Sequence, residues 1–184
     1  GPAREMHPMF EQVIIPRLQE EGFFPEIDCY IQIRTAGIGE SALAEKVEHL
    51  FEGKESLVVG YCAHAGMVDL RLSSLDGSIL TEQALHHLAD ACRDTIGEDF
   101  VCLGDRTLAE VIFRELRSLN KTLAVAESCT GGLLSSSFTE IPGISKVFHG
   151  GAVCYHNDAK VQMLDVPESM LEQHGAVSEE TAIA

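Results

Sequence analysis

Residues 122–132 include the residue types that nucleophilic catalysis requires, in the sequence TLAVAESCTGG. The apolar run 123–126 is long enough for a buried strand, and small residues ending in Gly-Gly follow it before the chain becomes apolar again. This order predicts a strand, a turn and a helix, with free backbone N–H groups and the positive dipole end of the helix facing the turn. Ser128 or Cys129 could attack an electrophilic carbon there, and the helix amides could bind the resulting oxyanion.

The same stretch also allows a simpler interpretation. Ser and Thr are favoured helix caps, so Ser128 and Thr130 could serve only to begin the helix. Cys129 is a rival nucleophile, because a helix N-terminus favours the thiolate. Glu127 could cap the helix or bind a ligand instead of taking part in catalysis. The local pattern leaves these alternatives open.

A second buried strand is predicted over residues 147–154, VFHGGAVC. Tyr155 follows it, and Asn157 is the expected N-cap of a helix that carries Lys160. Open α/β sheets place ligands at the carboxyl ends of their strands, so Ser128, Tyr155 and Lys160 could lie around one site.

These three side chains could share the work of hydrolysis. A buried Lys beside a Ser can act as general base, and Tyr155 could relay a proton or hold the substrate. Each residue also has a plainer alternative. Lys160 could be a solvated surface charge, and Tyr155 could be an aromatic residue at the rim of the strand.

The composition restricts the classes of partner. Lys and Arg number 13 against 29 Asp and Glu, a net charge of −16, which disfavours nucleic acid and anionic membrane surfaces. No apolar run reaches the roughly 18 residues of a membrane helix. The 6 cysteines form no C-x-x-C pair, a pattern typical of a reducing cytoplasm. His149, His156 and His174 lack metal-ligand spacing, so we expect neither a metal nor a cofactor.

A compact unit is predicted upstream of these motifs, with the order β-α-β-β-α-β. Such a small α+β sandwich resembles RNA-binding KH modules, but the GXXG phosphate clamp is missing and the segment is acidic, so RNA binding is disfavoured. The predicted elements are a strand over 29–34, a helix over 41–51, a hairpin over 57–63 and 68–72, a helix from its cap Thr81 through 96, and a strand over 100–103. A short helix over 9–18, disturbed by Pro16, and a loop over 22–26 come before them.

The remainder is predicted to be α/β. A helix over 107–119 leads into the first strand, helices follow over 133–139, 157–164 and 167–175, and Ser178 is the N-cap of one more. Two strands are few for a doubly wound domain. We therefore expect the first half of a three-layer α/β domain, in a chain that is a fragment at both ends.

Three motifs carry a specific resemblance. AESCTGG at 126–132, IPGISKVFHGGAVCYHNDAK at 141–160 and HGAVSEE at 174–180 resemble the carboxy-terminal nicotinamide-nucleotide amidohydrolase domain of the competence/damage-inducible CinA family. ESALAEKVEHLF and AHAGMVDLRLSS look like that family's KH-type linker domain, and GPAREM is similar to the end of its molybdopterin-binding-like domain. The resemblance implies a tail of that domain plus linker over 1–26, a KH-like domain over 27–104 and part of the amidohydrolase domain over 105–184.

The resemblance also implies an activity, which we assign to a longer parent protein. Members hydrolyse the carboxamide of nicotinamide mononucleotide to nicotinic acid mononucleotide and ammonia without a metal. By motif position the nucleophile is Ser128 and the base Lys160, with Tyr155 assisting. The implied partners are this small nucleotide and a second copy of the chain in a homodimer. The substrate-binding residues by this resemblance are Glu127, Thr130, Gly131 and Gly132. An alternative is a non-catalytic linker or oligomerisation module.

Overall fold

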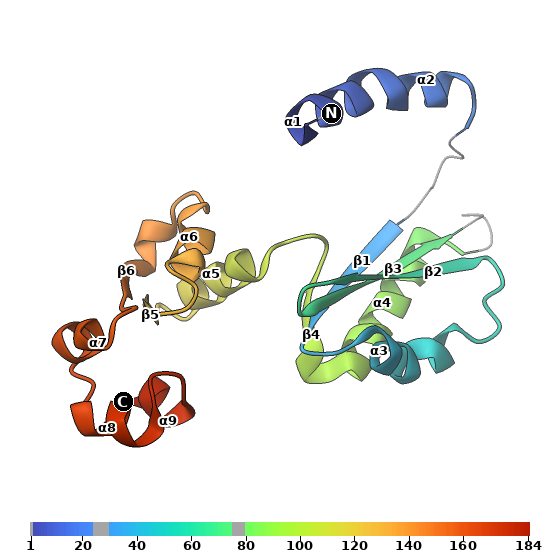
Figure 1. Ribbon diagram of the computed structural model, residues 1–184. Coiled ribbons are helices and arrows are strands. Elements are labelled where there is room, and N and C mark those ends of the chain that lie inside the picture. Colours follow the sequence, from blue (N-terminus) through green and yellow to red (C-terminus); the bar gives the residue numbers. More distant parts are fainter. Residues whose placement is uncertain (1, 24–29, 75–79) are drawn as a thin grey trace. The chain divides into compact units, whose positions relative to one another are not determined.

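The computed structural model of the chain describes residues 2–23, 30–74 and 80–184. Contacts between residues divide the chain into two compact units, Gly1–Asp105 and Arg106–Ala184 (Figure 1). The mixed helix and sheet class expected from the sequence is confirmed, with an antiparallel sheet in the first unit and a parallel pair of strands in the second. The finer division of the first unit at residue 26 stays a prediction. Among the described residues, no helix combines the length and apolar character needed to cross a bilayer.

The first unit has the predicted order β-α-β-β-α-β. Its four strands are all antiparallel to their neighbours and lie in the order β2-β3-β1-β4. The predicted hairpin is confirmed, and so is the N-cap at Thr81, whose hydroxyl accepts a hydrogen bond from the Ala84 N–H at 3.3 Å. The bounds are β1 (Tyr30–Ala36), α3 (Glu40–Val47), a 3-10 turn (Glu48–Phe51), β2 (Leu57–His64), β3 (Met67–Ser74), α4 (Glu82–Ile96), a second 3-10 turn (Gly97–Asp99) and β4 (Phe100–Leu103).

The core of this unit lies between the sheet and helices α3 and α4, which cover one face of it (Figure 1). Ile33, Leu70 and Leu72 point inward from the strands, because alternate side chains of a strand share a face. Burial raises the pKa of the Cys92 thiol to about 12, so this cysteine behaves as a small hydrophobic residue.

The N-terminal helical segment is longer than predicted. It runs through α1 (Ala3–Met9), a π-helical turn (Phe10–Ile14) and α2 (Ile15–Glu20). Pro16 is the second residue of α2, which directly follows the π-helical turn, and the helix continues past it to Glu20. The loop predicted over 22–26 lies partly outside the described residues. Cys29, the first residue of the strand predicted over 29–34, lies outside them as well.

The second unit contains two parallel strands, β5 (Leu123–Glu127) and β6 (Phe148–Val153). One predicted cap is wrong. Helix α7 is capped by His156 and not by Asn157, because the His156 Nδ1 accepts from the Asp158 N–H at 3.2 Å and Asn157 is already helical. The predicted cap at Ser178 is confirmed. The helices are α5 (Leu108–Ser118), α6 (Leu133–Thr139), a 3-10 turn (Ile144–Lys146), α7 (Asn157–Leu164), α8 (Glu168–His174) and α9 (Glu179–Ile183).

A polar network lies on the sheet face of the first unit that the helices leave open. Asp69 is 1% exposed, and its two carboxylate oxygens accept from Arg34 Nε at 2.8 Å and Arg34 Nη2 at 2.9 Å. Gln32 Nε2 donates to the same carboxylate at 2.9 Å, and His64 Nε2 lies 3.2 Å away. The hydrogen bonds from Arg34 hold the pKa of Asp69 below its ordinary value. The charge of Asp69 therefore stabilises the folded unit.

We predict that Asp69→Asn destabilises the first unit by about 3 kcal/mol at pH 7, because Arg34 then lacks a counter-charge in a poorly hydrated place. The lowered pKa means that this stabilisation is present above about pH 4, the unfolded value, and is lost as the pH falls through the folded value. Urea titrations with a hydrogen-exchange pulse that reports on residues 67–74 measure both effects.

The control is Asp90→Asn, which removes an exposed partner of Arg93 and should change stability by no more than about 0.5 kcal/mol. Equal stability of the Asp69 variant and the unaltered chain at pH 7 would show that the network contributes nothing.

Candidate active site

The pairing of β5 with β6 brings the two motif regions together. The register runs through Glu127 opposite Val153, and the Cys154 N–H then donates to the Glu127 carbonyl at 2.7 Å. Because the strands are parallel and end at the same level, the turn that begins at Ser128 lies beside the turn that leads into α7. This is the arrangement that the sequence predicted.

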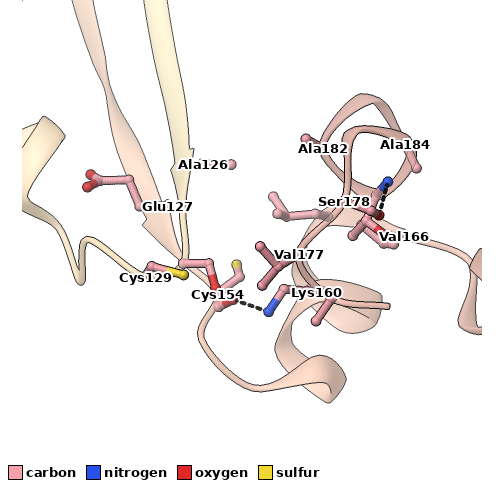
Figure 2. A pocket seen from close by; sticks show the side chains of 14 residues that line it. Ala126, Glu127, Cys129, Cys154, Lys160, Val166, Val177, Ser178, Ala182 and Ala184 are labelled. Atoms are coloured by element: carbon pink, nitrogen blue, oxygen red, sulfur yellow. Dashed lines mark hydrogen bonds between the residues drawn. The ribbon is translucent and has the colours of Figure 1, made fainter. Parts of the chain in front are cut away.

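A pocket of about 480 Å³ opens at this end of the strands (Figure 2). Of the predicted site residues, Ser128, Lys160 and Glu127 line it, and Cys129 lines it too. Its opposite wall comes from the end of α7 and from the segment that leads into α9. Among the described residues, no three His, Cys, Asp or Glu side chains are grouped so as to hold a metal ion. The other lining residues are Ala126, Cys154, Leu164, Val166, Ala176, Val177, Ser178, Thr181, Ala182 and Ala184.

Lys160 is buried, with 6% of its surface exposed, so the alternative of a solvated surface charge is wrong. Its amine donates to the backbone carbonyls of Cys154 at 3.0 Å and Tyr155 at 2.8 Å. Within the described part of the chain it forms no ion pair, and the nearby Asp158 lies 3.6 Å from His156 instead. The amine is therefore held by two neutral acceptors at the edge of the pocket.

The other predicted residues lie outside the pocket lining. Tyr155 is 74% exposed, and the contact that it makes with Lys160 is through its carbonyl. Gly131 and Gly132 have φ values of 60° and 102°, a left-handed backbone that side chains disfavour, and they allow the chain to reverse between β5 and α6. Thr130 contributes its carbonyl to the turn, accepting from the Leu133 N–H at 3.2 Å.

Glu127 is the last residue of β5, and its carboxylate caps the start of α6. Its Oε2 accepts from the Thr130 hydroxyl at 2.7 Å and the Leu134 N–H at 2.9 Å, and its Oε1 accepts from the Ser135 N–H at 2.8 Å and the Ser135 hydroxyl at 2.5 Å. These bonds, the one from the Ser135 hydroxyl first, lower the pKa of Glu127 to about 2. The carboxylate is therefore charged throughout the physiological range.

This cap corrects one expectation. The first-turn amides of α6 were predicted to bind an oxyanion, but those of Leu134 and Ser135 are already bonded to Glu127. A carboxylate of the chain itself satisfies them better than a transient ligand. Among the described residues, the backbone N–H groups of Cys129, Thr130 and Gly132 have no hydrogen-bond partner. The turn, and not the helix, therefore has the free donors.

Sequence analysis missed part of the site. Cys154 was predicted only as the last residue of a strand, yet its carbonyl accepts from Lys160 and its N–H donates to the Glu127 carbonyl of β5. Ser178 was named only as part of a motif and as a helix cap, and Thr181 was not named; both line the pocket. Ser135 was not considered, because nothing in the local sequence links it to a carboxylate eight residues earlier. The HGAVSEE motif was the one available signal for the far wall.

Comparison with known proteins shows the family of the chain. The family model described as the CinA C-terminal domain matches residues 105–184, and that of the damage-inducible protein CinA KH domain matches residues 32–101. A CinA-like protein of Parasynechococcus marenigrum is 40% identical over 185 residues, and one of Kosmotoga olearia is 36% identical over 187 residues. Both alignments cover 100% of this chain and 44% of the relative, so the chain spans less than half the length of these proteins.

A solved structure also shows sequence similarity. The competence/damage inducible protein CihA from Agrobacterium tumefaciens is 45% identical over 41% of this chain and 46% of its own, with a TM-score of 0.40. The matches to the two family models follow one another along the chain, and the relatives align with it from end to end. The chain therefore belongs to the CinA family of competence- and damage-inducible proteins.

Proposed function

We propose that the pocket of the second unit is the hydrolytic site of a nicotinamide mononucleotide amidohydrolase, with Ser128 as nucleophile and Lys160 as general base. The observation that carries the proposal is the presence of Ser128 and the buried amine of Lys160 in the lining of one pocket. The resemblance of the three motifs supports the choice of substrate. The activity is proposed for a protein that contains this chain.

The geometry of Lys160 suits a base. Its two hydrogen bonds to the Cys154 and Tyr155 carbonyls use two of the three hydrogens of an ammonium group. The remaining position on the nitrogen holds either the third proton or, in the neutral amine, the lone pair. A lone pair held in this way can take the proton of Ser128 as its oxygen attacks the carboxamide carbon.

The remaining steps follow from the free groups of the turn. The carbonyl oxygen becomes an oxyanion, for which the N–H group of Cys129, a residue of the pocket lining, is the available donor because it has no partner among the described residues. Lys160 returns the proton to the leaving nitrogen, ammonia departs, and an ester of Ser128 remains. A water molecule attacks this ester and Lys160 takes its proton. As the ester bond to Ser128 breaks, Lys160 returns that proton to the serine oxygen, and the acid is released.

The wall formed by the end of α7 and the segment that leads into α9 combines apolar and hydroxyl groups, and this combination fits the substrate. Leu164, Val166 and Val177 offer an apolar surface to a flat pyridine ring, while Ser178 and Thr181 offer hydroxyl groups. We propose that Tyr155, which is exposed at the end of β6, assists from outside the lining by holding the substrate or relaying a proton. Thr130, Gly131 and Gly132 would lie near the substrate as parts of the turn.

We predict that Ser128→Ala lowers the rate of ammonia release from nicotinamide mononucleotide by about 10³-fold or more, because no other group replaces the attacking oxygen. Cys129→Ala, a neighbouring substitution in the same pocket lining, should keep most of the rate. An enzyme-coupled ammonia assay measures both variants, in this chain and in a longer polypeptide that contains it. An inactive Cys129 variant beside an active Ser128 variant would reverse the assignment.

For the base, we predict that Lys160→Arg abolishes turnover, because a guanidinium stays protonated and cannot accept the serine proton. Thermal melts followed by circular dichroism test whether the domain remains folded. Lys146→Arg, at an exposed position of the same unit, is the matched control and should leave the rate unchanged. Near-normal turnover of the Lys160 variant would make Tyr155 the better candidate for the base.

Self-association is a second role with an observation in its favour. Several large apolar side chains of the second unit are exposed, with Leu133 at 69%, Val177 at 84% and Ile183 at 77%. Apolar residues exposed in this number on one small unit are typical of surfaces that become covered in an assembly. We therefore propose that the chain forms a homodimer through this unit.

The dimer predicts a mass that rises with concentration from the 20.0 kDa of one chain towards twice that value in light scattering. Ile183→Glu should shift this rise to higher concentration, because it adds a charge to an exposed apolar position. A constant mass of one chain up to millimolar concentration would contradict the proposal.

A further inference from the structure

We infer that Glu127 is a positioning residue that fixes the nucleophile and the general base relative to each other, and not a ligand of the substrate. The inference rests on the proposed function in one respect, the assignment of Ser128 and Lys160. It goes beyond that function because it concerns how Ser128 and Lys160 are held in fixed positions relative to each other.

The backbone of Glu127 reaches the base through a single residue. The Glu127 carbonyl accepts from the Cys154 N–H at 2.7 Å, and the Cys154 carbonyl accepts from the Lys160 amine at 3.0 Å. Ser128 is the next residue after Glu127. A displacement of Glu127 therefore moves the attacking oxygen directly and moves the acceptor of Lys160 through Cys154.

The side chain of Glu127 fixes the other end of the same turn. Three of its four accepted hydrogen bonds come from Leu134 and Ser135, on the far side of the reversal at Gly131 and Gly132, and the fourth comes from Thr130, just before the reversal. The carboxylate thus closes a loop around the residues from 128 to 133. With a pKa of about 2 the carboxylate remains ionised at any pH at which the enzyme would work, so protonation does not break these hydrogen bonds.

The same contacts argue against a substrate ligand. Both carboxylate oxygens already accept two hydrogen bonds each from the chain, and Glu127 is 6% exposed. Figure 2 shows the carboxylate turned away from the Lys160 amine, although Glu127 contributes to the pocket lining. A substrate would have to displace charge-assisted bonds of the protein in order to reach it.

Close packing of β6 against α6 supports the arrangement independently. A Cβ placed on Gly151 would lie 2.2 Å from the Ser135 hydroxyl oxygen and 3.0 Å from Val125 Cγ2. Gly151 pairs with Val125 in the sheet, two positions before Glu127. The absence of a side chain at 151 is what lets Ser135 approach the strands and donate twice to the carboxylate.

Glu127→Gln tests the inference with almost no change in shape. One carboxylate oxygen becomes an NH₂ group, and either orientation of the amide sets this group against the N–H of Leu134 or of Ser135, where two donors cannot bond. The hydroxyl groups of Thr130 and Ser135 can turn to accept, but a backbone N–H cannot. We expect the turn to shift and the reacting groups to separate.

The first measurement is steady-state hydrolysis of nicotinamide mononucleotide. Glu127→Gln should lower kcat by about 10- to 100-fold, the effect of a misplacement near 1 Å, with KM changed by less than about threefold. Glu140→Gln, an exposed carboxylate at the other end of α6, is the matched control and should change neither constant. A raised KM with unchanged kcat would overturn the inference and make Glu127 a substrate ligand, and no change in either would also overturn it.

The second measurement separates this inference from the choice of substrate. An alkyl fluorophosphonate, in which Ser128 displaces fluoride at phosphorus, is followed by mass spectrometry of the labelled peptide. Ser128 should be labelled in the unaltered chain, and Glu127→Gln should slow the labelling about 10-fold or more while circular dichroism shows a folded chain. Labelling without ammonia release refutes the proposed substrate alone. Absence of Ser128 labelling in the unaltered chain, or equal rates in both, overturns the inference.

Two further variants keep the test decisive if Glu127→Gln does not fold. Ser135→Ala removes one of the four donors and leaves the backbone bonds, so labelling of Ser128 should slow by a smaller factor, roughly threefold. Gly151→Ala displaces Ser135 without touching Glu127 and should slow labelling by more than Ser135→Ala does. Labelling at the unaltered rate in both variants would show that the carboxylate does not position Ser128.

Discussion

The pairing of β5 with β6 is the constraint on which the site of the second unit depends. Parallel strands require a long connection, and here it contains the turn at 128–132, α6 and the 3-10 turn before β6. Since both strands end at the same level, the residues after Glu127 and after Val153 meet. The last bond of the ladder, from the Cys154 N–H to the Glu127 carbonyl, sets how far apart Ser128 and Lys160 can be.

A buried amine without a carboxylate partner is the second feature on which the chemistry depends. Isolated charges are costly to bury, and Lys160 is stabilised by two backbone carbonyls and no formal negative charge within the described residues. Both acceptors are neutral backbone oxygens, so within the described residues the amine is positioned by hydrogen bonds and not by an ion pair.

Asp69 and Glu127, two of the carboxylates whose pKa is lowered, are stabilised in different ways. Asp69 is held by the guanidinium of Arg34, a formal counter-charge, on the open face of an antiparallel sheet. Glu127 has no cation in contact among the described residues and is held by two hydroxyl and two backbone N–H donors. The ion pair of Asp69 with Arg34 links β3 to β1 in the first unit. The Glu127 carboxylate joins β5 to the start of α6. It leaves the N–H groups of Cys129, Thr130 and Gly132 without a partner among the described residues.

Much of the fold follows from local sequence. The helix α4 with its cap Thr81, the cap Ser178 and the strand before Ser128 were all predicted within one or two residues, because each depends on neighbours along the chain. The motifs likewise pointed to Ser128 and Lys160.

The sequence could not decide which groups form hydrogen bonds between segments that are distant along the chain. Whether Lys160 is buried, whether Glu127 faces a ligand or the amides of α6, and which N–H groups remain free depend on contacts between residues distant in sequence, such as Ser135 with Glu127 and Cys154 with Lys160. Competition among donors for one carboxylate is settled only when the strands and helices are packed, so the tertiary structure alone determined where an oxyanion could be held.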